Sequence, residues 1–267
     1  MSEQMQVVIS GSQNLYPYFP CMYESLFAHN PDAKLWILIE DEKLPYETPE
    51  NVECVDISKQ TVFPSDGPNS RSPFTYLAMI RAAYPLLFTG VENGFGIRPL
   101  PRLDRIISMD VDVVVCDSLR PIWDTEFKNG EWFAAVPQFK SNSRPYGFAN
   151  RYFNAGIMVY NLEQMRKDKV AEKAIELLNR QKFTFLDEQV FNLLNMYEGD
   201  TKFVDLHPRW NQHLEVPQTI DRVGCIHYAG IKMIWQQDID MIYRGCHLEP
   251  YLKYNKEAEC RAAGIEF

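Results

Sequence analysis

The chain has 267 residues, of which 46% are hydrophobic and 13% aromatic, and it carries a formal net charge of −9. This apolar content is enough for a sizeable core and argues against intrinsic disorder. The negative charge argues against nucleic acid as a partner, because backbone phosphates would be repelled.

Strand-like runs alternate with segments of helical spacing along the chain. In chain order we predict strands at 6–10, 33–39, 52–57, 106–109, 113–116, 132–137, 155–161 and 223–227, and helices at 21–29, 74–88, 170–180 and 188–196. Pro85 should bend or end the helix at 74–88. The alternation predicts a single Rossmann-like α/β/α domain with a mostly parallel central sheet. In such sheets ligands bind beyond the carboxyl ends of the strands.

The N-terminal residues and the cysteines indicate the compartment. The first residues contain neither a basic segment nor a long apolar one, so we expect no secretory signal. No apolar run approaches the length of a transmembrane helix. The six cysteines form no Cys-x-x-Cys pair, which favours reduced core thiols in a cytoplasmic protein.

The segment 105–116 is an apolar strand, then Asp110-Val111-Asp112, then a second apolar strand. Burying an ionised carboxylate is costly unless it is paired or binds a cation. Two carboxylates two residues apart can share a cation of the Mg²⁺ or Mn²⁺ type, which prefers oxygen ligands. Such an ion would in turn hold a diphosphate. The spacing alone also permits a turn of a hairpin, in which both carboxylates face water.

Other candidate residues lie at the ends of predicted elements or on their faces. They are Arg81 in the helix at 74–88, Asn154 and Gly156 at a strand entrance, Asp187 and Glu188 at a helix start, and His227, Gly230 and Lys232 after the last strand. All but Lys232 have a structural alternative. Arg81 could be an exposed helix charge, Asn154 a turn residue and His227 a core histidine. Gly156 and Gly230 could mark tight turns, Asp187 could be a helix N-cap, and Glu188 could favour the helix dipole. Two loops, 61–73 and 138–151, are rich in Pro, Ser, Asn and Gly, and are surface loops or functional lids.

Taken in order, these blocks resemble the retaining glycosyltransferases of family 8, the group that includes glycogenin and bacterial lipooligosaccharide galactosyltransferases. The matching blocks are Arg81 and residues 106–123, 153–162, 186–193 and 226–235, and the resemblance extends with gaps from about Val7 to Trp235. It implies a GT-A fold. We therefore expect one domain over 1–267, with a nucleotide-binding part at about 1–125, a sugar and acceptor part at about 126–240 and a C-terminal extension at 241–267.

The resemblance also implies a metal-dependent, retaining transfer of a hexose. The donor would be a nucleotide-diphosphate sugar, usually a UDP-sugar, and the acceptor a glycan, glycolipid or protein. Asp110, Asp112 and His227 match the ligands of Mn²⁺ (or Mg²⁺). The expected catalytic residues are Asp187, Glu188 and Asn154, and the expected donor-binding residues are Arg81, Ser12, Asn14, Asp110, Val111, Gly230 and Lys232.

The chain departs from the family pattern at three places. Ser12 or Gln13 stands where the family has an aspartate that contacts uracil, so the base specificity is open. Lys232 is displaced by one position from the family's lysine. Glu188 follows Asp187 where the family often has glutamine.

Two other functions remain compatible with the fold. A sugar nucleotidyltransferase would carry a glycine-rich basic loop after the first strand, but residues 10–17 contain one glycine and no lysine or arginine. A non-catalytic protein that binds nucleotide sugars would keep the fold and lose the chemistry. The basic and aromatic residues between Tyr251 and Lys256 suggest peripheral contact with the inner membrane surface, or a solvated helix.

Overall fold

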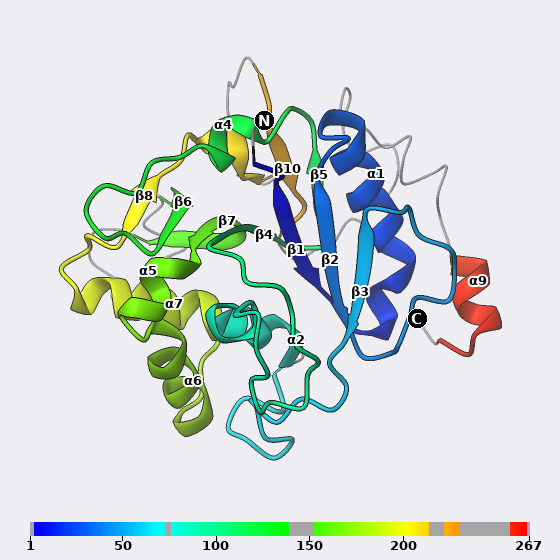
Figure 1. Ribbon diagram of the computed structural model, residues 1–267, viewed down its shortest axis with the longest axis horizontal. Coiled ribbons are helices and arrows are strands. Elements are labelled where there is room, and N and C mark those ends of the chain that lie inside the picture. Colours follow the sequence, from blue (N-terminus) through cyan, green and yellow to red (C-terminus); the bar gives the residue numbers. More distant parts are fainter. Residues whose placement is uncertain (1–2, 73–75, 139–151, 214–221, 230–256, 266–267) are drawn as a thin grey trace.

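A central β-sheet organises the molecule (Figure 1). The computed structural model describes residues 3–72, 76–138, 152–213, 222–229 and 257–265. Over these residues the sheet has seven strands in the order β3 (Val52–Asp56), β2 (Lys34–Ile39), β1 (Gln6–Ser10), β4 (Arg105–Met109), β7 (Phe153–Asn161), β6 (Phe133–Pro137) and β8 (Phe203–Asp205). Within it, β7 alone runs antiparallel to its neighbours. The predicted α/β class with a mostly parallel sheet is therefore confirmed.

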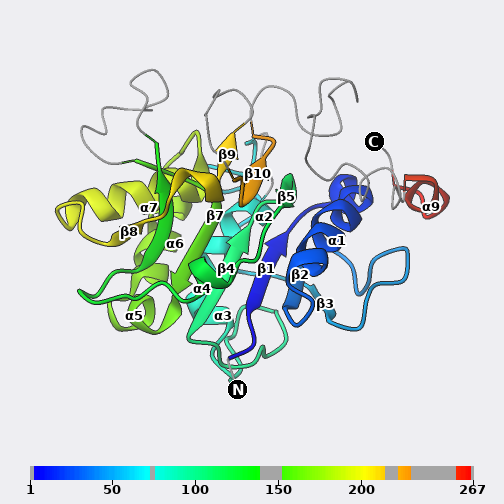
Figure 2. The same ribbon diagram turned by 90° about the horizontal axis from the view of Figure 1, so that it is seen from above.

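A small second sheet lies beyond the carboxyl ends of β1 and β4 (Figure 2). Its strands within the described residues are β5 (Val113–Val115), β10 (Cys225–His227) and β9 (Gln212–His213). β5 pairs antiparallel with β10, whereas β4 pairs with β1 and β7. The hairpin alternative for the segment 105–116 is therefore wrong, because its two strands belong to different sheets.

Helices cover both faces of the central sheet. In β1, Val7 and Ile9 pack on one side with α1 (Phe19–His29), and Val8 packs on the other. The second face is covered by α2 (Tyr76–Met79), η2 (Ile80–Ala83), α3 (Tyr84–Leu87), α5 (Leu162–Lys167), α6 (Val170–Arg180) and α7 (Leu186–Tyr197). The alternation of strand side chains thus gives three α/β/α layers. No helix in the described ranges has the length and apolarity needed to cross a bilayer.

The helix predicted over 74–88 is present over residues 76–87 as three consecutive helical segments, and the interruption expected at Pro85 is confirmed. The described part is divided into α2, η2 and α3, and α3 begins at Tyr84 with Pro85 in its first turn. Proline has no N–H to donate and clashes with the carbonyl four residues earlier, so a new helix starts there. The break leaves Arg81 in the short middle segment, where its side chain is buried.

Several short elements were not predicted. They are η1 (Gln13–Tyr18), α4 (Arg120–Trp123), α5, β8, η5 (Pro208–Trp210), β9 and α9 (Glu257–Ala262). Segments of two to six residues are too short for hydrophobic periodicity to be distinguished from chance. The longer amphipathic helix predicted at 170–180 has the bounds of α6.

Candidate active site

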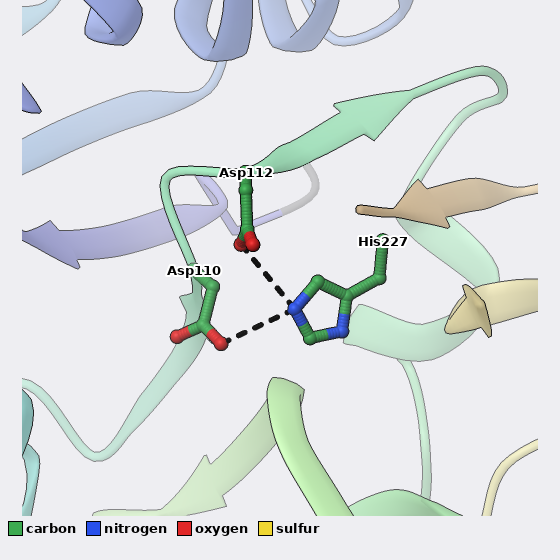
Figure 3. A group of neighbouring side chains, drawn as sticks. All are labelled: Asp110, Asp112 and His227. Atoms are coloured by element: carbon green, nitrogen blue, oxygen red, sulfur yellow. Dashed lines mark ion pairs between the residues drawn. The ribbon is translucent and has the colours of Figure 1, made fainter. Parts of the chain in front are cut away.

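Asp110, Asp112 and His227 come together at the edge where β4 ends (Figure 3). Nε2 of His227 lies 3.4 Å from Oδ2 of Asp110 and 3.3 Å from Oδ1 of Asp112. Asp112 and His227 are buried and Asp110 is partly exposed. His227 follows Asp112 by 115 positions along the chain, so the fold itself brings the imidazole to the carboxylates.

Backbone hydrogen bonds fix this arrangement. The Asp110 N–H donates to the carbonyl oxygen of Gly156 in β7 over 2.8 Å. The Tyr228 N–H donates to the carbonyl oxygen of Asp112 over 3.0 Å, and β10 pairs His227 with Val113. Strands β4 and β7 of the central sheet and β5 and β10 of the small sheet therefore place the three side chains.

The cluster suits a divalent cation. The three candidate ligand atoms all lie within 4.8 Å of one another. Burial lowers the pKa of His227, but Asp112 and Asp110 outweigh burial and raise that pKa to about 10. The imidazole nitrogen thus faces two negative charges, and a bound cation would take the place of its proton. Two carboxylate oxygens and one imidazole nitrogen match the ligand preferences of Mn²⁺.

Arg81 lies buried between two carboxylates. Its Nη1 is 2.6 Å from Oδ1 of Asp110, and its Nε is 2.8 Å from Oδ2 of Asp187. Nη1 also donates to the carbonyl oxygen of Ala155 over 2.9 Å. Burial opposes the charge on the guanidinium, but the two carboxylates raise the pKa of Arg81 well above its ordinary value. The alternative of an exposed helix charge is wrong.

Asp187 does not cap α7. The N-cap residue is Phe185, with no side-chain hydrogen bond to the helix, and Asp187 instead pairs with Arg81. Burial raises the pKa of Asp187 to about 6, although Arg81 opposes the shift. The preceding residue, Leu186, has a φ of 42°, a left-handed conformation that is rare for a bulky side chain. Such strain is typical of functional sites, and here it lies directly before Asp187 and Glu188.

Glu188 is held by three donors. Its Oε1 accepts from the Tyr152 hydroxyl over 2.6 Å, and its Oε2 accepts from Nδ2 of Asn154 and from the Ala155 N–H, each over 2.9 Å. Burial raises the pKa of Glu188 to about 7, and the hydrogen bonds from Tyr152 and Ala155 limit the rise. Because the carboxylate turns to the start of β7, its contacts go beyond support of the helix dipole.

Asn211 connects the histidine to this carboxylate and was missed in the sequence. Its Nδ2 donates to Oδ1 of Asn154 over 2.9 Å, and its Oδ1 is 2.9 Å from Nδ1 of His227. The Asn154 side chain in turn donates to Glu188. Asn211 lies in an irregular stretch just before β9, so no periodicity or motif could have indicated it.

The remaining predicted site residues are Ser12, Asn14, Val111, Gly230 and Lys232. Ser12 and Asn14 lie in the segment after β1, where the Ser12 hydroxyl donates to Oδ1 of Asn14 over 2.6 Å. Val111 is buried in the core on the α1 face. Gly230, Lys232, residues 139–151 and the stretch Tyr251–Lys256 lie outside the described residues.

The segment 61–72 is anchored on α6, because Nδ2 of Asn69 donates to the carbonyl oxygen of Leu178 over 2.6 Å.

Sequence relatives of the chain include a bacterial glucosyltransferase and a bacterial galactosyltransferase. Lipopolysaccharide 1,2-glucosyltransferase of Escherichia coli is 33% identical over 158 residues, and lipopolysaccharide 1,3-galactosyltransferase of Salmonella typhimurium is 28% identical over 154 residues. Each alignment covers 50% of this chain and 45% of the relative. General stress protein A of Bacillus subtilis is 27% identical over 178 residues, which are 57% of this chain and 61% of that protein. The chain thus spans about half the length of these relatives.

Solved structures show the fold. The structure of an active-site mutant of LgtC aligns with 95% of this chain over 96% of the LgtC chain, with a TM-score of 0.65 and 17% sequence identity. LgtC in complex with donor and acceptor sugar analogues matches 97% of this chain and 96% of its own, with a TM-score of 0.62 and 17% identity. Together with the seven-stranded sheet, these likenesses confirm the GT-A fold.

The family comparison covers the site itself. Residues 95–238 match the family described as "Glycosyl transferase family 8". This segment contains Asp110, Asp112 and His227, as well as Asn154 and Glu188, whereas Arg81 precedes it. The match extends over more than half of the sequence, and the chain belongs to glycosyl transferase family 8.

Proposed function

We propose that the protein is a metal-dependent retaining glycosyltransferase. It moves a hexose from a nucleotide-diphosphate sugar, of which a UDP-sugar is the expected form, to a glycan or another acceptor. The observation that carries this proposal is the cluster of Asp110, Asp112 and His227 at the carboxyl edge of the sheet, next to a second group of carboxylates around Arg81.

The charge balance of the site supports a cation. Among the described residues, the carboxylates of Asp110, Asp112, Asp187 and Glu188 gather around the guanidinium of Arg81 and the imidazole of His227. Arg81 is shared between Asp110 and Asp187. Asp112 has no comparable permanent positive partner in this group, since an imidazole is charged only when protonated. A divalent ion on Asp112 would supply the missing charge.

Asp110 has a separate partner for each carboxylate oxygen. Oδ1 accepts from Arg81, and Oδ2 faces His227. Arg81 therefore fixes the carboxylate in one orientation and leaves the other oxygen directed to the cation site. The bound ion would hold the donor diphosphate and stabilise the negative charge of the departing nucleotide.

Glu188 has the position and the environment of an electrostatic stabiliser. Positive charge develops at the anomeric carbon during glycosyl transfer. The carboxylate of Glu188 is oriented by Tyr152, Asn154 and the Ala155 N–H, so it need not reorganise as that charge appears. Asp187 uses both oxygens on Arg81. We therefore assign Asp187 a positioning role and Glu188 the closer interaction with the donor sugar.

The relatives narrow the substrate class. Two of them are named for transfer of galactose and glucose to lipopolysaccharide. These names support a hexose donor and a glycan or glycolipid acceptor for this chain. Because Ser12 or Gln13 stands where the family has a uracil-contacting aspartate, the donor base has to be tested together with the sugar.

A donor screen tests this proposal. UDP-glucose, UDP-galactose and their GDP and ADP counterparts would be incubated with Mn²⁺, with EDTA, and with the Asp112→Asn variant. We expect release of the nucleotide diphosphate from at least one donor, with Mn²⁺ and wild-type protein. A nucleotidyltransferase would instead form the nucleotide sugar and pyrophosphate from a sugar phosphate and a nucleoside triphosphate, in a separate incubation that supplies both. A binding protein would bind the donor and leave it intact, and either result would overturn the proposal.

A further inference from the structure

We infer that Asn211 is a positioning residue for the metal site: it holds His227 with its proton on Nδ1, so that Nε2 is the nitrogen that faces the cation. This inference rests on the metal dependence proposed above. It follows from the directions of four hydrogen bonds, which begin at a backbone amide and end at the imidazole.

The first two bonds set the orientation of Asn154. The Gly156 N–H is an unambiguous donor, and it lies 2.8 Å from Oδ1 of Asn154. On the other side, Oε2 of Glu188 lies 2.9 Å from Nδ2 of Asn154. The Gly156 N–H can only donate, so it fixes the Asn154 oxygen whether or not Glu188 is protonated, and an ionised Glu188 carboxylate can only accept. The Asn154 amide is therefore held with its oxygen towards Gly156 and its nitrogen towards Glu188.

The next bond sets the orientation of Asn211. Its side-chain amide lies 2.9 Å from Oδ1 of Asn154. Because that oxygen can only accept, the Asn211 group facing it must be the NH₂ group. The carbonyl oxygen of Asn211 is consequently turned to His227.

The last bond sets the imidazole. Oδ1 of Asn211 lies 2.9 Å from Nδ1 of His227. A carbonyl oxygen cannot donate, so Nδ1 must carry the proton, and Nε2 faces Asp110 and Asp112. A partner on the non-ligating nitrogen fixes both the tautomer and the ring plane of a metal-binding histidine. Asn211 supplies that partner.

Burial makes the amide hard to replace. Asn211 is 4% exposed and His227 is 2% exposed. Removal of the Asn211 oxygen would therefore take away the acceptor that Nδ1–H has in Asn211, in a place that solvent hardly reaches. The ring could then rotate or change its tautomer, and either change removes Nε2 from the two carboxylates.

The test compares Asn211→Leu, which removes the acceptor, with Asn211→Asp, which keeps one. Asn195→Leu is the control: Asn195 is also buried, and its amide bonds Asp200 and Lys202 near the opposite end of α7. Mn²⁺ binding to the full chain would be followed by the EPR signal of the free ion. We expect Asn211→Leu to bind Mn²⁺ about 10- to 100-fold more weakly, as is usual when the partner of a ligating histidine is lost. Asn211→Asp keeps an acceptor for Nδ1–H of His227 but loses the donor to Oδ1 of Asn154, so its Mn²⁺ affinity should fall less than that of Asn211→Leu.

A second readout observes the tautomer directly. ¹⁵N NMR of the wild type with Zn²⁺, a diamagnetic probe ion, should show His227 with a protonated Nδ1 and a metal-bound Nε2. Metal on Nδ1 would overturn the inference, even if Asn211→Leu failed to fold. Wild-type Mn²⁺ affinity in a folded Asn211→Leu variant would also overturn it. If wild type itself bound no Mn²⁺, the proposed metal dependence would fail first and the inference with it. An equal loss of Mn²⁺ affinity in Asn195→Leu and Asn211→Leu would point to a general effect of buried polar groups and would overturn the inference.

Discussion

The absence of a side chain at Gly156 makes room for the imidazole of His227. A Cβ built on Gly156 would lie 2.1 Å from Cε1 and 2.3 Å from Nδ1 of that ring. These distances are far below van der Waals contact, so β7 and β10 can bring His227 against residue 156 only because residue 156 is glycine. The glycine for which the sequence also allowed a tight turn thus forms part of the wall of the proposed metal site.

Gly156→Ala should therefore damage metal binding without any change of charge. The new methyl group would push the His227 ring away from Asp110 and Asp112, and we expect Mn²⁺ affinity to fall at least about 10-fold. Gly67→Ala is the control, because the nearest atom to its added Cβ is the Pro64 carbonyl oxygen at 3.2 Å. A folded Gly156→Ala protein with wild-type Mn²⁺ affinity would show that the ring position does not matter.

Glu188→Gln should lower turnover far more than donor affinity. A carboxylate stabilises the developing positive charge more than the neutral sugar, and such interactions appear in kcat. We expect kcat to fall roughly 10- to 1000-fold, by analogy with other electrostatic stabilisers. Glutamine can keep the same hydrogen-bond partners, because its oxygen can accept from Asn154 and Ala155 while its NH₂ group donates to the Tyr152 oxygen. Unchanged kcat, or a loss seen only in donor affinity, would assign Glu188 a structural role.

The pH dependence of kcat should report the same group. The pKa of Glu188 is raised to about 7, so the ionised fraction increases as the pH rises from about 6 to 8. Wild-type kcat at saturating donor should therefore rise over this range, and Glu188→Gln should lose that part of the rise. If both proteins keep the same profile, the titrating group lies elsewhere.

Stability should depend on pH in the opposite sense. The folded-state pKa of Glu188, about 7, lies above its reference value of 4.5, so the folded state keeps a proton that the unfolded chain has released. The stability gained from this neutral form is complete below pH 4.5 and is lost as the pH rises through 7. Urea unfolding in EDTA should show Glu188→Gln gaining stability relative to wild type between pH 5 and 8, by at most on the order of 3 kcal/mol. A constant difference would contradict the raised pKa.

Arg81→Met should destabilise the protein by about 3–5 kcal/mol, because it leaves Asp187 as an unpaired buried charge. The matched control is Arg98→Met, since Arg98 pairs with Glu53 at an exposed position and such pairs contribute about 1 kcal/mol or less. Denaturant unfolding of both variants would measure the difference. Equal, small losses would mean that the Arg81 pair is dispensable for stability.

Most of the fold could be predicted where local pattern and tertiary packing agree. α6 has one apolar stripe and one charged face, so its bounds at Val170 and Arg180 follow from periodicity. The division of the segment around Arg81 into three helical segments was not predicted, because the segment is buried on most sides and has no amphipathic period. Strands such as Phe203–Asp205 are stabilised by neighbours distant in sequence and have no signal of their own.

The residues of the candidate site likewise differ in whether the local sequence indicates them. Asp110 and Asp112 could be found because two carboxylates after a buried strand are unusual in local sequence. His227 needed the family resemblance, since a single histidine at a strand end has many structural explanations. Asn211 could not be found at all, because its importance comes from contacts to residues 16 and 57 positions away.

The central claim, that a divalent ion on Asp110, Asp112 and His227 holds the donor diphosphate, is tested most directly by calorimetric titration of UDP into the protein. We expect tight binding with Mn²⁺, and much weaker binding both in EDTA and in the Asp112→Asn variant with Mn²⁺. Equal UDP affinity under all three conditions would contradict the claim.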